Sequence, residues 1–188
     1  MDKIVLGLDL DGVLYDFHSA MFTYFQYEMK YTGTYQEFWL EYFRGLSKEK
    51  QKYYLALPIF YDAVIPSCRI MSFLEYAKDR AEIYYITHRP MEVESITKRH
   101  LKKYNFPYQD NLCITDDKVT ACRMYGVTHF LDDFANQVEA VAKITNAYLF
   151  AKPWNKEYRD KLTTVYSLEE FRQLVFENNM GDKNELVT

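Results

Sequence analysis

The sequence contains few cysteines, glycines and prolines. The three cysteines, Cys68, Cys113 and Cys122, are odd in number and lack the spacing of a metal site. A disulfide framework and a zinc cluster are therefore not expected, and a reducing compartment is the simplest setting. The six glycines and five prolines form no Gly-, Ser- or Pro-rich linker, which excludes collagen-like and low-complexity chains.

Long hydrophobic runs are also missing. The first run, Ile4–Leu8, has five residues before Asp9 interrupts it. This run is too short for the apolar part of a secretory signal, and no stretch approaches the roughly 18 apolar residues of a membrane helix. We therefore expect a cytoplasmic protein without a membrane partner.

The chain has no excess of positive charge. Its 23 Lys and Arg residues face 27 Asp and Glu residues, which gives a net charge of −4. This balance argues against a duplex nucleic-acid partner, whereas a small anionic ligand needs only a few local donors. With 188 residues, of which 48% are hydrophobic, the sequence predicts one globular unit. It leaves open whether the protein forms a homodimer.

Short apolar runs alternate with longer helical patterns. The runs have the length and flanks of buried strands, and they are Ile4–Leu8, Ile83–Ile86, Leu112–Ile114, His129–Leu131 and Ala147–Phe150. The patterns between and after them predict helices over Ser67–Arg80, Met91–Tyr104, Asp117–Tyr125, Asn136–Lys143 and Leu168–Glu177. Strands that alternate with helices are typical of an α/β protein with a parallel sheet.

The segment between the first two strands is too long for one crossover. The helix at Ser67–Arg80 is sufficient for the crossover, so the residues before it form an insertion. Its patterns predict helices over Phe17–Tyr31, Tyr35–Phe43 and Lys48–Leu55. We therefore divide the chain into a core, 1–14 and 67–188, and a helical lobe, 15–66. Sixteen aromatic residues lie between Tyr15 and Tyr61; most of them are expected to form the core of the lobe.

Two carboxylates follow the first strand directly, in Asp9-Leu10-Asp11-Gly12-Val13. Residues i and i+2 of extended chain point the same way, so both carboxylates face one spot beyond the strand. Gly12 allows the backbone to turn sharply there. Two carboxylates this close repel each other and need a cation or a shared proton. An acidic turn without a function is the alternative for this motif alone.

Further polar residues come at the ends of later strands. They are Thr87 and His88 after the second strand, Lys118 at the start of the helix after the third, and Asp132-Asp133 after the fourth. Each has an ordinary interpretation by itself, such as a hydroxyl at a helix start or a solvated lysine. Because the carboxyl ends of parallel strands line one crevice, we expect them to converge there. Hard oxygen ligands without a His or Cys cluster indicate Mg²⁺.

The ordered set Asp9-x-Asp11-Gly12-Val13, Thr87, Lys118 and Asp132-Asp133 resembles the haloacid dehalogenase superfamily of phosphohydrolases. A closer likeness is to the 5′(3′)-deoxyribonucleotidase group, which rests on the insertion, Phe17, Thr87-x-Arg89-Pro90 and Lys152-Pro153-Trp154-Asn155. The resemblance implies a three-layer, Rossmann-like parallel sheet in strand order 5-4-1-2-3. It also implies that the insertion after strand 1 acts as a cap.

The resemblance also assigns roles. Asp9 is expected to be the nucleophile that forms an aspartyl-phosphate, and Asp11 the general acid and base. Mg²⁺ is expected to be held by the Asp9 carboxylate, the Asp11 backbone carbonyl and Asp133, with Asp132 reaching it through water. Thr87 and Lys118 are expected to bind the phosphoryl oxygens. His88 is a further phosphate candidate, although a structural histidine at a helix start explains it equally well.

The expected function is Mg²⁺-dependent hydrolysis of a phosphomonoester, with a nucleoside monophosphate as the leading substrate. Phe17, Phe38 and Trp39 are the candidate base-stacking residues of the cap. A phosphatase for a sugar phosphate or a polynucleotide end is one alternative. A phospho-acceptor signalling or binding domain is another, but there the acidic pair comes first and the acceptor Asp lies mid-chain. A catalytically silent module is disfavoured because no motif residue is missing.

Overall fold

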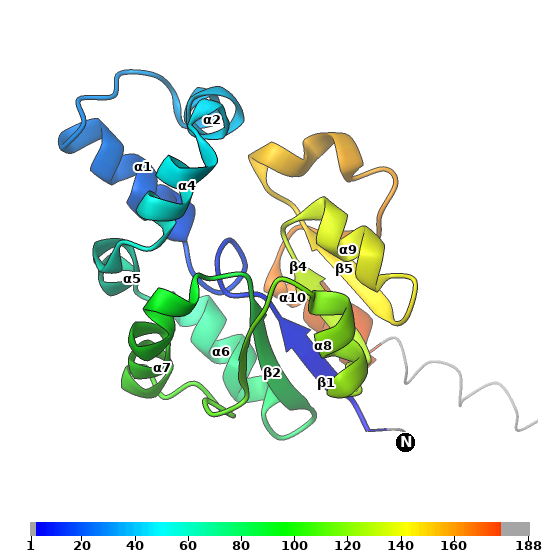
Figure 1. The fold of residues 1–188 in the computed structure, drawn as a ribbon. Helices are drawn as coiled ribbons and strands as arrows, with labels where there is room; N and C mark the ends of the chain where they lie inside the picture. Colours follow the sequence, from blue (N-terminus) through cyan, green and yellow to red (C-terminus); the bar gives the residue numbers. More distant parts are fainter. Residues whose placement is uncertain (1–2, 178–188) are drawn as a thin grey trace, which may run out of the picture.

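A six-stranded parallel sheet forms the centre of the computed structural model, which describes residues 3–177 (Figure 1). The strand order is β3-β2-β1-β4-β5-β6. The strands are β1 (Val5–Leu8), β2 (Glu82–Thr87), β3 (Leu112–Ile114), β4 (His129–Asp132), β5 (Asn146–Phe150) and β6 (Thr164–Val165). Read from β5 to β3 this is the predicted order 5-4-1-2-3, so the predicted fold class is confirmed.

The strand β6 was not predicted from the sequence. This edge strand has two residues, and its Val165 pairs with Phe150 of β5. Two residues are too few to show the alternation of polar and apolar side chains by which a strand is recognised. β1 lies between β2 and β4, with Leu8 opposite Tyr85 and Leu131. The first motif therefore emerges at the middle of the sheet.

Helices cover both faces of the sheet and give the fold its three layers. One face packs on α6 (Cys68–Ala77) and α10 (Leu168–Arg172), and the other on α8 (Lys118–Met124) and α9 (Ala135–Val141). The remaining elements of the core are η2 (Met91–Val93), α7 (Glu94–Lys103), η3 (Pro153–Tyr158) and η4 (Gln173–Glu177). None of the helices within residues 3–177 is long and apolar enough to cross a bilayer.

The insertion forms a helical lobe beside the sheet (Figure 1). Its elements are α1 (Phe17–Tyr27), α2 (Tyr35–Glu37), η1 (Phe38–Tyr42), α3 (Phe43–Gly45), α4 (Lys48–Leu55) and α5 (Pro58–Ala63). Thr34 and Glu37 form a reciprocal cap at the start of α2, which holds two otherwise unpaired backbone donors. No helix was predicted over α5, although the proline at its first position suits the first turn of a helix.

Aromatic side chains fill the interior of the lobe. Phe25, Phe38 and Phe60 are fully buried there, and the same cluster includes Val93 and Ile96 from η2 and α7. An ion pair between Asp62 of α5 and Arg99 of α7, 3.2 Å long, joins the two parts at the surface. The lobe therefore rests on the core through the packing of α5 on α7.

Candidate active site

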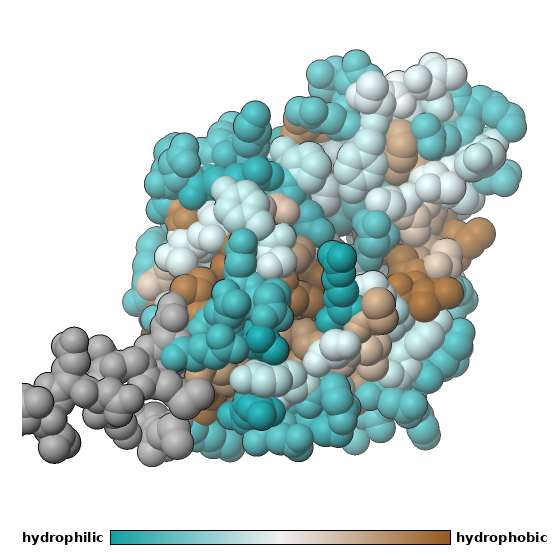
Figure 2. Space-filling model, turned by 180° about the vertical axis from the view of Figure 1, so that it is seen from behind, coloured by the Kyte–Doolittle hydropathy of each residue, from teal (hydrophilic) through white to brown (hydrophobic). Residues whose placement is uncertain are grey.

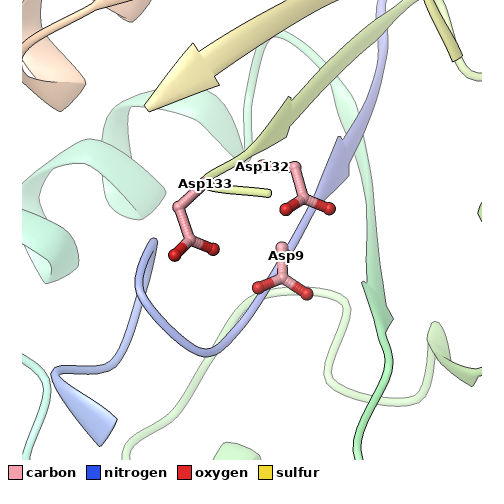
Figure 3. Close-up of side chains that lie close together, drawn as sticks. All are labelled: Asp9, Asp132 and Asp133. Atoms are coloured by element: carbon pink, nitrogen blue, oxygen red, sulfur yellow. The ribbon is translucent and has the colours of Figure 1, made fainter. Parts of the chain in front are cut away.

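Three buried carboxylates meet at the carboxyl ends of β1 and β4. Asp9 follows β1, Asp132 ends β4, and Asp133 comes next (Figure 3). One oxygen from each lies within 4.8 Å of the others. Adjacent parallel strands thus bring together residues that are more than 120 positions apart in the chain.

The ammonium group of Lys118 lies among these carboxylates. Lys118 is the first residue of α8, and its Nζ donates to Asp9 Oδ1 at 2.6 Å and to Asp132 Oδ2 at 2.7 Å. Burial alone would lower the pKa of Lys118, but the charges of Asp132 and Asp9 hold it above its usual value. Lys118 therefore remains charged at neutral pH.

The carboxylates outnumber this cation. The pKa of Asp9 is raised to about 7, because burial raises it most and the charges of Asp132 and Asp11 add to the rise, against the opposing effect of Lys118. Burial also raises the pKa of Asp133, with Asp132 and Asp9 adding to the effect. Buried oxygen donors with unbalanced negative charge are the kind of site that a hard divalent cation occupies. The residues therefore fit Mg²⁺.

Asp133 is held on several sides. The indole Nε1 of Trp154 donates to Asp133 Oδ2 at 2.9 Å, and the side-chain amide of Asn155 donates to its backbone carbonyl at 2.9 Å. Gly12, with a φ of +88°, packs so closely against this carboxylate that a methyl group there would overlap it. Trp154 and Asn155 entered the sequence-based prediction only through the family resemblance, and neither was expected to contact Asp133; a donor-rich segment after a strand end was the available signal.

Asp11 does not join the three carboxylates. Its oxygens accept two hydrogen bonds from Arg89, from Nε at 2.8 Å and from Nη2 at 2.6 Å. The Arg89 side chain is 1% exposed, against 19% for that of Asp11. Arg89 supported only the family resemblance in the sequence, and no contact with Asp11 was predicted for it. A buried arginine needs an acidic partner, but the sequence does not show which one.

The two phosphate candidates after β2 have different surroundings. Thr87 ends β2 and is buried, on the strand next to β1. The His88 side chain is 59% exposed, and its Nε2 lies 2.7 Å from Asp116 Oδ1. The structure therefore does not bring His88 into the buried cluster.

The three aromatic candidates are buried in the lobe. Phe17 stacks on Tyr61 with ring centroids 5.0 Å apart, and Phe38 is fully enclosed by other rings of the lobe. Trp39 lies at the edge of the lobe, where its ring centroid is 6.4 Å from that of Trp154. Of the three, Trp39 therefore lies beside a residue that holds the carboxylate cluster.

His18 lies between these two tryptophans, and the sequence analysis gave it no role. Its ring centroid is 4.6 Å from that of Trp39 and 4.2 Å from that of Trp154. Burial lowers the pKa of His18 to about 4, so the ring is neutral. Its Nδ1 finds no hydrogen-bond partner in the described part of the chain.

A cavity of about 840 Å³ opens beside the loop that carries Gly12. It runs between α6 and the start of α10, and its lining includes Asp16, Ile65, Lys152 and Tyr166. Seen from behind, the molecule shows hydrophobic residues in the recesses between more prominent hydrophilic ones (Figure 2). The two segments that join the lobe to the core, at Asp16 and at Ile65, both line this cavity. Gly12, which packs against Asp133, lines it as well.

A family model matches residues 3–180 of the chain, nearly its full length. Its description is 5′ nucleotidase, deoxy (pyrimidine), cytosolic type C protein (NT5C). No curated protein matches the chain.

Solved structures share the fold at low sequence identity. A haloacid dehalogenase family hydrolase from Deinococcus radiodurans, with bound phosphate and sodium, has a TM-score of 0.64 and 14% identity over 95% of this chain and 97% of its own. A haloacid dehalogenase-like hydrolase from Streptococcus pneumoniae has a TM-score of 0.61 and 14% identity, over 92% and 98%. A haloacid dehalogenase superfamily hydrolase from Geobacter sulfurreducens has a TM-score of 0.55 and 12% identity, over 92% of this chain and 96% of its own.

Proposed function

Because the chain belongs to the cytosolic type C family of 5′ nucleotidases, within the haloacid dehalogenase superfamily, we propose that this phosphoric monoester hydrolase dephosphorylates nucleoside 5′- or 3′-monophosphates in the cytoplasm. The observation that carries the proposal is the buried cluster of Asp9, Asp132 and Asp133 around Lys118.

The cluster would hold Mg²⁺ through Asp9, Asp133 and the backbone carbonyl of Asp11, with Asp132 acting through water. When bound, the ion would neutralise charge on the phosphoryl oxygens and on the carboxylates around them. Thr87 and Lys118 would bind the same phosphoryl oxygens by hydrogen bonds, and His88 would join them only by leaving Asp116.

In the first step, a carboxylate oxygen of Asp9 would attack phosphorus. The bond from phosphorus to the leaving oxygen would break, and the carboxyl proton of Asp11 would pass to that oxygen, which departs as the nucleoside hydroxyl. The products of this step are an aspartyl-phosphate on Asp9 and an ionised Asp11.

In the second step, a water molecule would attack the phosphorus of the aspartyl-phosphate. The Asp11 carboxylate would take a proton from that water, and the bond between phosphorus and Asp9 would break. Inorganic phosphate leaves, and both carboxyl groups return to their starting states.

The lobe, 15–66, would act as a cap over this centre. Phe17 and Trp39 would provide stacking faces for the base once the cap opens, and Phe38 would support them from within the lobe. The three rings are buried in this conformation, so the cap would have to move before a base could stack on them.

A phosphate-release screen tests the proposal. Nucleoside monophosphates and sugar phosphates would be compared with and without Mg²⁺. We expect release from nucleotides in the presence of Mg²⁺. Release from sugar phosphates alone would shift the assignment to another small-molecule phosphatase, and no release from any phosphomonoester would refute it.

Mg²⁺ should stabilise the protein. Neutralising the buried carboxylates favours the folded state, and an ion at about 100 times its dissociation constant adds about 2.7 kcal/mol to the free energy of unfolding. We expect a higher melting temperature by calorimetry with Mg²⁺ than with a chelator, and no activity with the chelator. Asp133→Asn should reduce this rise, whereas an unchanged rise would place the ion elsewhere.

Trp154→Phe should weaken Mg²⁺ binding about 10- to 100-fold, because such outer contacts orient the ligating carboxylate. The variant keeps an aromatic ring but removes the hydrogen bond to Asp133. The Mg²⁺ concentration for half-maximal activity measures the effect. Tyr158→Phe, later in the same segment, is the matched control, and equal values for the two variants would contradict the assignment.

A further inference from the structure

Arg89 is a buried cation outside the carboxylate cluster. It follows Thr87 by two residues and belongs to the loop after β2, yet only 4% of the residue is exposed. Besides its two hydrogen bonds to Asp11, its Nη1 donates to Thr97 Oγ1 at 3.0 Å. Each of the three guanidinium nitrogens thus donates a hydrogen bond, two of them to Asp11 and one to Thr97.

Aromatic rings hold the guanidinium from two parts of the molecule. The ring centroid of Tyr61, in α5 of the lobe, lies 4.5 Å from the guanidinium carbon, and that of Tyr15, in the loop after β1, lies 5.2 Å away. Thr97, the third contact, belongs to α7 and in turn donates to the carbonyl of Val93 at 2.9 Å. The position of Arg89 therefore depends on both the core and the lobe.

Stability alone does not explain this arrangement. Removing an arginine from water is costly, and well-packed apolar residues are often as stable as a buried ion pair. The planar, two-point contact does fix one property that an apolar pair cannot, which is the orientation of the Asp11 carboxylate.

We propose that Arg89 is a positioning residue, which holds the Asp11 carboxyl in the orientation for proton transfer to the leaving oxygen. The proposal rests on the proposed function, in which Asp11 is the general acid. Because Tyr61 packs on the guanidinium, the alignment of Asp11 requires the lobe to be seated on the core.

The test compares substrates that differ in their need for an acid. Benzyl phosphate releases an alkoxide, which must be protonated, whereas p-nitrophenyl phosphate of similar size releases a stable phenolate without help. The ratio kcat/KM reports steps up to the departure of the leaving group, so it isolates the acid role from the later base role. The variants are Arg89→Lys, which keeps the charge but loses the planar fork, and Thr97→Val, which removes one anchor of Arg89.

For Arg89→Lys we expect kcat/KM to fall about 100-fold with benzyl phosphate and less than about threefold with p-nitrophenyl phosphate, because a positioned acid contributes roughly 10²- to 10⁴-fold. Thr97→Val should show the same selectivity to a smaller extent. Asp11→Asn should show the largest difference between the losses of kcat/KM with benzyl phosphate and with p-nitrophenyl phosphate. Adding Arg89→Lys to Asp11→Asn should not increase this difference.

Arg99→Lys is the matched control, because Arg99 also links the core to the lobe but contacts Asp62, not Asp11; both substrates should keep the wild-type kcat/KM. An equal loss with both substrates, a gain in rate, or no change in Arg89→Lys would overturn the proposal. If the wild-type protein hydrolyses neither these two substrates nor any nucleoside monophosphate, the proposed function itself fails.

Discussion

Replacing Asp9 by asparagine should lower the rate of phosphate release by at least about 10⁴-fold, because removal of an enzyme's nucleophile has effects of this size. The amide oxygen is a poor nucleophile, and the substitution keeps the size of the side chain. It also replaces one of three crowded, buried carboxyl groups by a neutral amide, so the metal-free protein should unfold no more easily than the wild type. Phosphate release and thermal unfolding measure the two effects.

Asp110→Asn is the control for this substitution, because Asp110 lies exposed in the turn before β3. It should keep wild-type activity. In acid-quenched reactions with labelled substrate, the wild type and the control should carry phosphate on the protein, and Asp9→Asn should carry none. Labelling of Asp9→Asn would place the nucleophile on another residue.

Lys118→Met should reduce kcat/KM by about 10³-fold, the upper range for loss of one donor to a developing charge. It should also destabilise the metal-free protein by about 3 kcal/mol, because removing one partner of a buried ion pair leaves the others uncompensated. The buried lysine pairs with two carboxylates at once. Steady-state kinetics and urea unfolding in the presence of a chelator measure the two losses.

Lys98→Met provides the comparison, because Lys98 forms an exposed ion pair with Glu94 at 2.7 Å. Such a surface pair contributes about 0.5 kcal/mol or less, and it lies away from the buried cluster. Equal effects of the two substitutions would contradict the role of Lys118.

The sequence predicted the sheet because buried strands have a local signature. Asp9 and Asp11 directly follow the apolar run Ile4–Leu8, and a chain that alternates strands and helices forms a parallel sheet in few ways. The strand order came from the family resemblance, whereas the meeting of Asp9 with Lys118 and Asp133 followed from the rule that the carboxyl ends of parallel strands line one crevice. What the sequence could not show was β6, whose two residues carry no periodicity, and α5, whose Pro58 suits a helix start as well as a stop.

The contacts that hold the centre together were harder to predict than the centre itself. Arg89 and Trp154 donate to Asp11 and Asp133 across loops of different strands, and loop conformation leaves no pattern in the sequence. His88 was a phosphate candidate because it follows the end of β2, and its contacts could not be predicted for the same reason. Its pairing with Asp116 depends on which way one exposed side chain turns.

The close packing around Asp133 has a consequence for the choice between ions. Gly12 packs against this carboxylate, Trp154 donates to one of its oxygens, and Asn155 holds the backbone carbonyl of the same residue, so the carboxylate has little room to rotate. Calcium takes six to eight oxygens at about 2.3–2.6 Å, and its carboxylates often swing to bind through both oxygens; magnesium needs near-octahedral geometry at about 2.0–2.1 Å. A carboxylate that cannot swing disfavours the larger ion, so rigidity at position 133 would give the centre its selectivity.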